Sequence, residues 1–334
     1  MNKTAIIGAG IAGLACANVL KDAGHDVCVF DKGRGPGGRM STRRAMTNLG
    51  EASFDHGAQY FTARDPDFAA TLNRLTTQGA AAQWTGDLVK LDKDGRASPL
   101  ANEALYVGKP GMNNIVRALG KDITIAWATR VEKIERDGDH WHLIAEQGQD
   151  LGLFDDVICA VPAEQVAPLL ETIAPAFAQS SIAINSLPCW AGLFAFERAL
   201  CIPFDAMRLE GHEMIDFIAM NHSKPDRAGP PAYVVHATPD WSARHLEKAP
   251  EAIANHLRDA LLSFSDDRPA LVFETAHRWR FARVEVSNGP GFLWDDAKKL
   301  GACGDWLSGP RVESAWLSGH HLGQAIVKAR HAGE

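Results

Sequence analysis

The alternation of apolar and polar positions is most regular at the start of the chain. Residues 4–7 form a short apolar run that ends at a glycine, which is typical of a buried parallel strand. Residues 11–23 place mostly apolar side chains on one helical face, and Gly24 follows as a C-terminal cap. Residues 26–30 form the next apolar run. The first 31 residues therefore predict a complete β-α-β unit.

Apolar runs with strand or helix periodicity return along the rest of the chain. We expect strands over 126–135, 140–146, 156–161, 192–196, 215–220, 233–237 and 300–304, and helices over 162–170, 251–264 and 312–330. This order predicts an α/β protein in which a Rossmann-type domain, a parallel sheet with helices, is interrupted by an α+β domain with a mixed or antiparallel sheet. We expect the nucleotide-binding domain to comprise residues 1–65, 105–165 and 280–334, and the inserted substrate domain residues 66–104 and 166–279.

The turn between the first predicted strand and helix reads Gly8-Ala9-Gly10-Ile11-Ala12-Gly13. In this position Gly8 permits a tight turn, Gly10 lets the backbone approach a diphosphate, and Gly13 lets the helix pack on the strand. The helix amides that follow favour negative charge. Asp31 ends the second strand, about 20 residues on, where a carboxylate can accept hydrogen bonds from ribose hydroxyls. The pattern predicts a dinucleotide cofactor.

Two further motifs distinguish between dinucleotides. Gly37-Gly38-Arg39 follows Asp31 closely, and Gly304-Asp305 follows the last predicted strand. Both resemble elements of flavoproteins in the amine oxidase superfamily. There the arginine offers a cationic fork to the diphosphate and the aspartate reaches the ribityl or diphosphate region. The resemblance implies FAD, with the helix near Val312 directing its amides at the flavin.

Four more segments, 57–62, 108–112, 276–279 and 303–306, make nearly the whole chain resemble the bacterial renalase-like family. The resemblance implies noncovalent FAD and a mixed sheet that roofs the flavin. It also implies oxidation of dihydro-NAD(P) isomers that are reduced at the wrong ring carbon. A hydride passes to flavin N5, and dioxygen reoxidises the flavin, which gives NAD(P)+ and hydrogen peroxide.

The motifs and the resemblance together assign the site residues. His236 and Trp279 are expected to face the flavin and sandwich a planar substrate ring. His56 is expected to be structural. The expected cofactor-binding residues are Gly8, Gly10, Ile11, Ala12, Gly13, Asp31, Lys32, Gly38, Arg39, Met40, Ala58, Gln59, Tyr60, Phe61, Val131, Gly304, Asp305 and Val312.

Two other functions remain open from the sequence. A flavin amine oxidase commonly has a tyrosine after the Gly-Asp motif, whereas Pro310 and Arg311 stand in that neighbourhood here. A flavin-binding redox sensor without catalysis would retain the same cofactor motifs. Reduction of the flavin by a nicotinamide isomer or by an amine would distinguish the three.

Composition narrows the class of partner. The chain has 334 residues and a formal charge of −7, which disfavours general binding to nucleic acid or to an anionic membrane. It has six cysteines, and they form no C-x-x-C pair, so we expect reduced thiols and no metal site. We find no apolar stretch of the ~18 residues that cross a membrane. The sequence predicts a cytoplasmic oxidoreductase whose partners are a small-molecule substrate and dioxygen.

Overall fold

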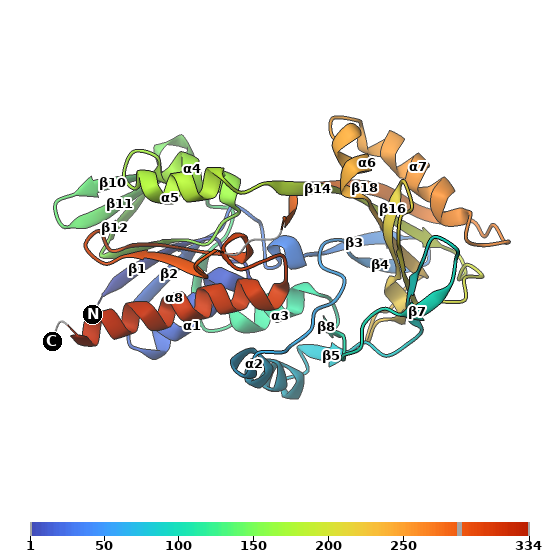
Figure 1. Cartoon of the computed structure of the whole chain (residues 1–334), viewed down its shortest axis with the longest axis horizontal. Coiled ribbons are helices and arrows are strands. Elements are labelled where there is room, and N and C mark those ends of the chain that lie inside the picture. Colours follow the sequence, from blue (N-terminus) through green and yellow to red (C-terminus); the bar gives the residue numbers. More distant parts are fainter. Residues whose placement is uncertain (1, 286–288, 333–334) are drawn as a thin grey trace.

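The computed structural model describes residues 2–285 and 289–332. The molecule is elongated and has two halves, each built around its own sheet (Figure 1). Two long strands, β14 (Ser186–Phe196) and β18 (Leu271–Val284), run from the junction of the halves into the sheet of the second half.

A six-stranded sheet organises the half that contains the N-terminus. Its order is β19-β20-β13-β1-β2-β9, and every neighbouring pair is parallel except β19 with β20. The neighbouring strands β13 and β20 are wholly buried, as expected for a parallel sheet covered on both faces, whereas the edge strands β9 and β19 are only partly buried. The strands are β1 (Lys3–Ile7), β2 (Asp26–Phe30), β9 (Thr124–Ala126), β13 (Asp156–Cys159), β19 (Phe292–Asp295) and β20 (Leu300–Cys303).

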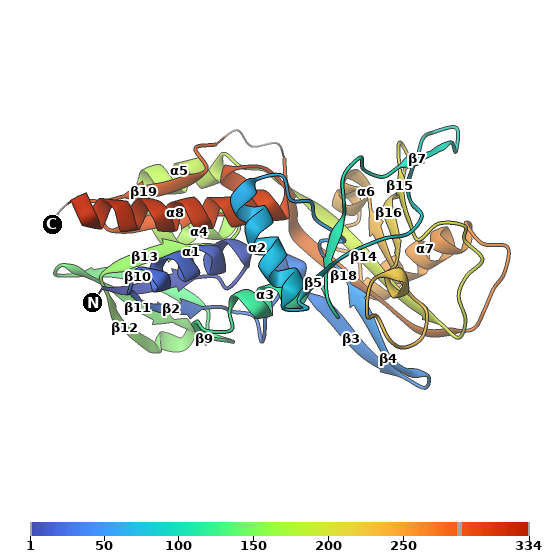
Figure 2. The same ribbon diagram turned by 90° about the horizontal axis from the view of Figure 1, so that it is seen from below.

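Helices from the two ends of the chain cover one face of this sheet. Helix α1 (Ile11–Asp22) packs along α8 (Val312–Ala332), as Figures 1 and 2 show from two sides. The other face carries a smaller sheet and two short helices, which share one apolar core with it. These are β10 (Val131–Asp137), β11 (His140–Ala145), β12 (Asp150–Phe154), α4 (Ala163–Leu170) and α5 (Pro175–Ile182).

A seven-stranded mixed sheet forms the second half, in the order β18-β14-β17-β16-β15-β6-β7. Its neighbours are antiparallel except for β15 with β6. Helices α6 (Pro239–Arg244) and α7 (Pro250–Leu262) pack mainly against β14 and β18 and complete a separate apolar core. The remaining strands are β6 (Leu88–Leu91), β7 (Ala97–Pro99), β15 (Ala206–Leu209), β16 (Ile215–Met220) and β17 (Ala232–Ala237).

Shorter elements connect the halves. The hairpin of β3 (Thr42–Thr47) and β4 (Gly50–Asp55) extends from the nucleotide half to pack against β17 (Figure 2). The remaining short elements of the chain are η1 (Gly38–Met40), α2 (Pro66–Thr77), β5 (Ala81–Gln83), β8 (Tyr106–Gly108), α3 (Asn113–Leu119), η2 (Glu146–Gly148), η3 (Asn221–Ser223) and η4 (Asp305–Leu307).

The α/β fold class predicted from the sequence, with a Rossmann-type sheet and a second mixed sheet, is confirmed. The strand expected over 126–135 is instead two strands, because Ala128 adopts a positive φ of 53° between β9 and β10. The division into domains stays a proposal. The apolar faces of α2, α4 and α5 join the cores of the nucleotide half.

Candidate functional site

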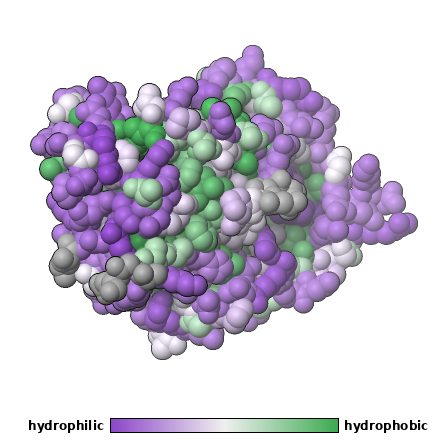
Figure 3. All heavy atoms as spheres, turned by 60° about the vertical axis from the view of Figure 1, so that its left-hand side comes forward, coloured by the Kyte–Doolittle hydropathy of each residue, from purple (hydrophilic) through white to green (hydrophobic). Residues whose placement is uncertain are grey.

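A cavity of about 1120 Å³ lies where the two halves meet. Residues of α1, η1, the 56–62 segment, β14 to β18 and the start of α8 line it. Figure 3 shows apolar side chains gathered across the middle of one face of the molecule, between more hydrophilic borders. The cavity exceeds the range of roughly 300–1,000 Å³ that is usual for small-ligand pockets. It can therefore hold an extended ligand together with a second, smaller one.

The glycine turn before α1 forms one end of this cavity. A Cβ on Gly13 would lie 2.0 Å from the Gly8 carbonyl oxygen, so Gly13 serves the packing of the turn itself. A Cβ on Gly10 would meet no atom within 4 Å in the described part of the chain, and Gly10 lines the cavity. Helix α1 begins there without a side-chain cap. Open space beside uncapped helix amides fits a diphosphate.

The Asp31 side chain stabilises the glycine turn through hydrogen bonds. Its carboxylate oxygens accept hydrogen bonds from the backbone N–H groups of Ala9, at 2.7 Å, and Gly33, at 2.6 Å. Asp31 does not line the cavity. A carboxylate has further lone pairs, so a ribose contact remains compatible with these bonds. The neighbouring Lys32 is exposed and donates to the Gln165 amide oxygen at 2.6 Å.

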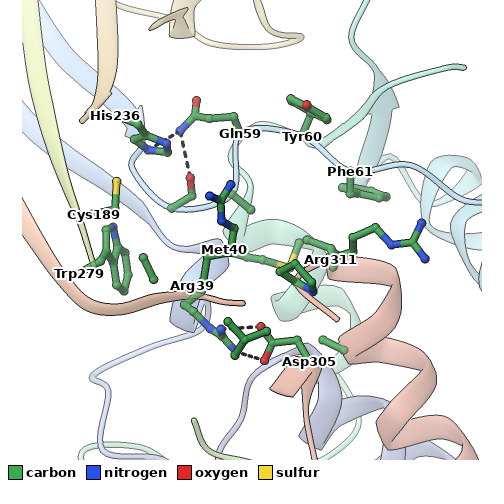
Figure 4. A pocket seen from close by; sticks show the side chains of 18 of the residues that line it. Arg39, Met40, Gln59, Tyr60, Phe61, Cys189, His236, Trp279, Asp305 and Arg311 are labelled. Carbon is green, nitrogen blue, oxygen red and sulfur yellow. Dashed lines mark hydrogen bonds and ion pairs between the residues drawn. The ribbon is translucent and has the colours of Figure 1, made fainter. Parts of the chain in front are cut away.

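Arg39 and Asp305 form a bidentate ion pair within the cavity lining, with bonds of 2.6 and 2.5 Å (Figure 4). Arg39 belongs to η1 and Asp305 to η4, so the pair connects segments 266 residues apart. The Asp305 side chain is 8% exposed and that of Arg39 is 31% exposed. The pairing neutralises a carboxylate that would otherwise repel a phosphate, and Arg39 keeps N–H donors free for one.

A buried ionic cluster lies behind the cavity wall. Asp55, Lys224 and Arg227 have side chains that are at most 1% exposed, and both cations contact Asp55 Oδ2. Although burial opposes it, their charges lower the pKa of Asp55 to about 2. Burial lowers the pKa of Lys224 to about 8. Lys224 Nζ also donates to Gln59 Oε1 at 3.0 Å, which fixes the orientation of that amide.

The fixed amide of Gln59 in turn determines the proton on His236. Gln59 Nε2 donates to the backbone carbonyls of Asp55 and Gly57, which uses both of its protons. His236 Nε2 lies 3.2 Å from that nitrogen and 3.1 Å from the carbonyl oxygen of His56. We therefore assign the proton to His236 Nε2, which donates to His56. Within residues 2–285 and 289–332, Nδ1 of His236 has no partner and is left as an acceptor.

Trp279 shares the same carbonyl. Its Nε1 donates to the oxygen of His56 at 2.9 Å, and its ring stacks on the His56 ring at 5.2 Å between centroids. Burial is the largest cause that lowers the pKa of His236 to about 4 and that of His56 to about 3. Both rings are neutral at pH 7. His236 and Trp279 thus lie on the same side of the cavity as two uncharged rings held by one carbonyl (Figure 4), and we call this pair the aromatic wall.

The structure brings most of the sequence-predicted residues to one cavity. Six of them do not line it: Gly8, Gly13, Asp31, Lys32, Gly38 and Val131. Val131 is the first residue of β10, and its side chain is buried in the core. Those that line the cavity are Gly10, Ile11, Ala12, Arg39, Met40, Ala58, Gln59, Tyr60, Phe61, His236, Trp279, Gly304, Asp305 and Val312. Their roles toward a ligand stay proposals.

Sequence reasoning missed the residues that organise the aromatic wall. His56 supplies the carbonyl shared by His236 and Trp279, and Asp55 and Lys224 set the Gln59 amide. None of them belongs to a spaced motif. Lys224 stands in the polar segment 221–227, which has the composition of an ordinary loop, so no local signal reveals its partner Asp55, 169 residues away.

The described residues, 2–285 and 289–332, also bear on metal binding and on a membrane span. No group of three or more His, Cys, Asp or Glu side chains there could hold a metal ion. No helix there is long and apolar enough to cross a membrane.

The fold and the site define a dinucleotide-binding oxidoreductase, and comparison with known proteins specifies its family. Residues 91–326 match the flavin containing amine oxidoreductase family, and residues 6–75 match the NAD(P)-binding Rossmann-like domain. The chain belongs to the flavin containing amine oxidoreductase family. Its cofactor is FAD, and it is an FAD-dependent oxidoreductase.

Individual relatives are more distant. A stretch of 70 residues is 44% identical to the L-glutamate oxidase precursor of Streptomyces diastatochromogenes, covering 20% of the chain and 10% of that protein. Cyclohexylamine oxidase of Brevibacterium oxydans has a similar structure, with a TM-score of 0.76, 13% identity, and 99% of both chains covered. An oxidoreductase of Methanosarcina mazei gives a TM-score of 0.72 at 16% identity, over 96% of this chain and 100% of that one. These structural likenesses show the fold.

Proposed function

We propose that this flavoenzyme oxidises dihydro-NAD(P) isomers that carry the extra hydride at the wrong carbon of the nicotinamide ring. The substrate loses a hydride and becomes aromatic NAD(P)+. Dioxygen accepts the two electrons with one further proton and leaves as hydrogen peroxide. FAD, when bound, would supply the hydride acceptor that couples oxidation of the substrate to reduction of dioxygen.

The cavity residues have distinct proposed roles toward FAD. The uncapped amides of Ile11 and Ala12 hold the diphosphate, with Arg39 beside them. The segment from Ala58 to Phe61, with Met40, would contact the cofactor between the two halves of the molecule. The start of α8 at Val312 adds a second helix N-terminus. Asp31, Lys32 and Val131 belong to the adenosine end.

The observation that carries the proposal is the aromatic wall. Trp279 offers a planar face against which a dihydropyridine ring can stack. The free Nδ1 of His236 can accept a hydrogen bond from a carboxamide N–H, the polar group of nicotinamide. Because both groups are fixed by the carbonyl of His56, the wall is set before a substrate binds. The wall orients the ring and needs to move no proton, since hydride loss requires no base.

Oxidation of an amine is the second candidate. It is favoured by family membership and by Asp216, a cavity-lining carboxylate that makes no ion pair among the described residues and could attract an ammonium group. Against it, Pro310 and Arg311 line the cavity where amine oxidases of this family commonly place a tyrosine.

Anaerobic mixing of the FAD-loaded protein with a substrate panel tests the proposal. The panel comprises borohydride-reduced NAD+, which contains the misreduced isomers, together with pure NADH, cyclohexylamine and L-glutamate. We expect rapid loss of flavin absorbance with the isomer mixture and slow or no loss with the others. Bleaching by an amine alone would establish the second candidate. The absence of bleaching by any compound would favour a redox sensor.

A further inference from the structure

Arg208 has an unusual environment on the substrate side of the cavity. It lies on β15 and lines the cavity, and its guanidinium carbon is 5.6 Å from the ring centroid of Phe217 on the neighbouring strand. Phe217 also contacts Tyr60, at 6.0 Å between ring centroids. Arg208, Phe217 and Tyr60 therefore form a continuous part of the cavity lining. Tyr60 is predicted to contact FAD, and Arg208 lies in the substrate half of the molecule.

The guanidinium of Arg208 makes no hydrogen bond or ion pair within residues 2–285 and 289–332, and its Nε is buried without a partner. Three other arginines of the cavity lining are paired, and the fourth, Arg283, is exposed to solvent. Arg39 binds Asp305, Arg64 binds Glu103, and Arg311 lies 3.6 Å from Glu313. Leaving a buried donor without a hydrogen-bond acceptor is unfavourable. A ligand that accepts from Arg208 would remove this cost.

The chemistry of a free guanidinium specifies the ligand. Its planar N–H fork matches the oxygens of a phosphate or a carboxylate, and it repels an ammonium group. Phe217 supports the cation through its ring face. Asp216 also lines the cavity but forms no ion pair with Arg208, so it leaves the fork available.

We propose that Arg208 is the anion-binding residue on the substrate side of the cavity, and that it donates hydrogen bonds to a phosphate oxygen of the dinucleotide substrate. The phosphate identity rests on the function proposed above. The anion-binding role itself rests on the unpartnered guanidinium. The residue then sets specificity by attracting phosphorylated dihydronicotinamides and disfavouring cationic amines.

The kinetic test compares substrates with and without phosphate. In Arg208→Gln we expect KM for the misreduced dinucleotide to rise about 10- to 100-fold, the scale of a lost charge-assisted hydrogen bond. The KM for the corresponding dihydronicotinamide riboside, which has no phosphate, should change by less than about 2-fold. Arg208→Lys should give an intermediate KM. An equal rise for both substrates, or no rise for either, would overturn the proposal.

A matched control removes the same charge elsewhere. Arg280 lies on β18, pairs with Glu247 at 2.6 Å and does not line the cavity. Arg280→Gln should leave both KM values at the wild-type level. A KM rise in this control equal to that of Arg208→Gln would show that net charge alone is responsible. Retained FAD and an unchanged Tm in Arg208→Lys establish that folding is intact.

A binding measurement separates this proposal from the proposed function. Inorganic pyrophosphate is titrated calorimetrically into the FAD-loaded protein, in which the cofactor already fills the diphosphate site. We expect binding by wild type and Arg280→Gln, and loss of binding by Arg208→Gln, even if no dihydronicotinamide is oxidised. Binding of succinate in place of pyrophosphate would overturn the phosphate assignment. Equal pyrophosphate binding by all variants would overturn the role of Arg208.

Discussion

The two halves of the molecule contribute different kinds of groups to the cavity, mainly backbone groups in one half and side chains in the other. In the nucleotide half, the ligand-facing groups are the backbone amides of one short turn and helix start, which leave open space beside Gly10, together with the Arg39–Asp305 ion pair. In the substrate half, they are side chains held by other side chains: His236 depends on Gln59, which depends on Lys224. A backbone site can be recognised from local spacing, whereas a side-chain site exists only after distant strands have assembled.

This difference means that substitutions in the two halves should have different effects on FAD binding and on substrate orientation. The nucleotide half should lose FAD when its turn is altered. The substrate half should keep FAD and lose substrate orientation, except where the buried ionic cluster is broken and stability falls.

Breaking the ionic cluster should have the largest effect. Asp55→Asn leaves Lys224 and Arg227 without their carboxylate at positions that are at most 1% exposed. Breaking a buried pair in this way costs about 3–5 kcal/mol. Urea unfolding should show this loss in the free energy of unfolding. The surface variant Asp94→Asn, whose partner Arg96 is largely exposed, should change it by less than about 1 kcal/mol; equal losses would contradict a special role for the cluster.

Acid should destabilise the substrate half next. His56 and His236 resist protonation in the folded protein, with pKa values of about 3 and about 4, whereas unfolded histidines titrate near 6.5. Below about pH 6.5 the unfolded state therefore binds more protons, so stability falls toward pH 4, by up to about 1.4 kcal/mol per pH unit for each ring.

The measurement is Tm between pH 7.5 and 5, and His236→Asn should flatten part of the decline. An unchanged slope in this variant would remove His236 from the acid sensitivity.

The glycine turn offers the sharpest contrast within one motif. Gly13→Ala places a methyl group 2.0 Å from the Gly8 oxygen and should lower stability by about 1–3 kcal/mol together with FAD retention. Gly10→Ala meets no atom of the described chain, so it should preserve the Tm of the apoprotein while weakening FAD binding. The measurements are apoprotein Tm and FAD titration. Wild-type FAD affinity in Gly10→Ala would show that the cofactor does not pass beside this residue.

Trp279→Phe should have the smallest effect. It keeps an aromatic face but removes the hydrogen bond to the carbonyl of His56, worth about 0.5–1.5 kcal/mol. We expect the rate of flavin reduction to fall about 2- to 10-fold with FAD content unchanged. A reduction of 100-fold or more would show that Trp279 does more than align the ring.

The sequence allowed prediction of the fold class and of the segments around Gly10, Arg39 and Asp305, because each carries a local motif with a physical requirement. It also placed His236 and Trp279 in one cavity through family resemblance. It did not show that Arg39 and Asp305 bind each other across 266 positions.

What the sequence did not reveal is mainly contacts between side chains from distant segments. The side-chain network of Asp55, Gln59, Lys224 and His236 leaves no periodic signal, since its members come from separate segments and meet through the packing of β4, η3 and β17. The strand β18, which carries Trp279, was also not anticipated as one element, because its partly exposed residues lack a clear apolar alternation.

The most direct test of the account is the anaerobic rate of flavin reduction in two isosteric variants of His236, measured with borohydride-reduced NAD+ and with FAD content determined in parallel. His236→Asn retains a polar atom near the Nδ1 position, and His236→Gln retains one near Nε2. We predict full FAD content in both, and a reduction rate that His236→Gln lowers more than His236→Asn. Wild-type rates in both variants, or loss of FAD in both, would contradict the assignment of the aromatic wall to the substrate.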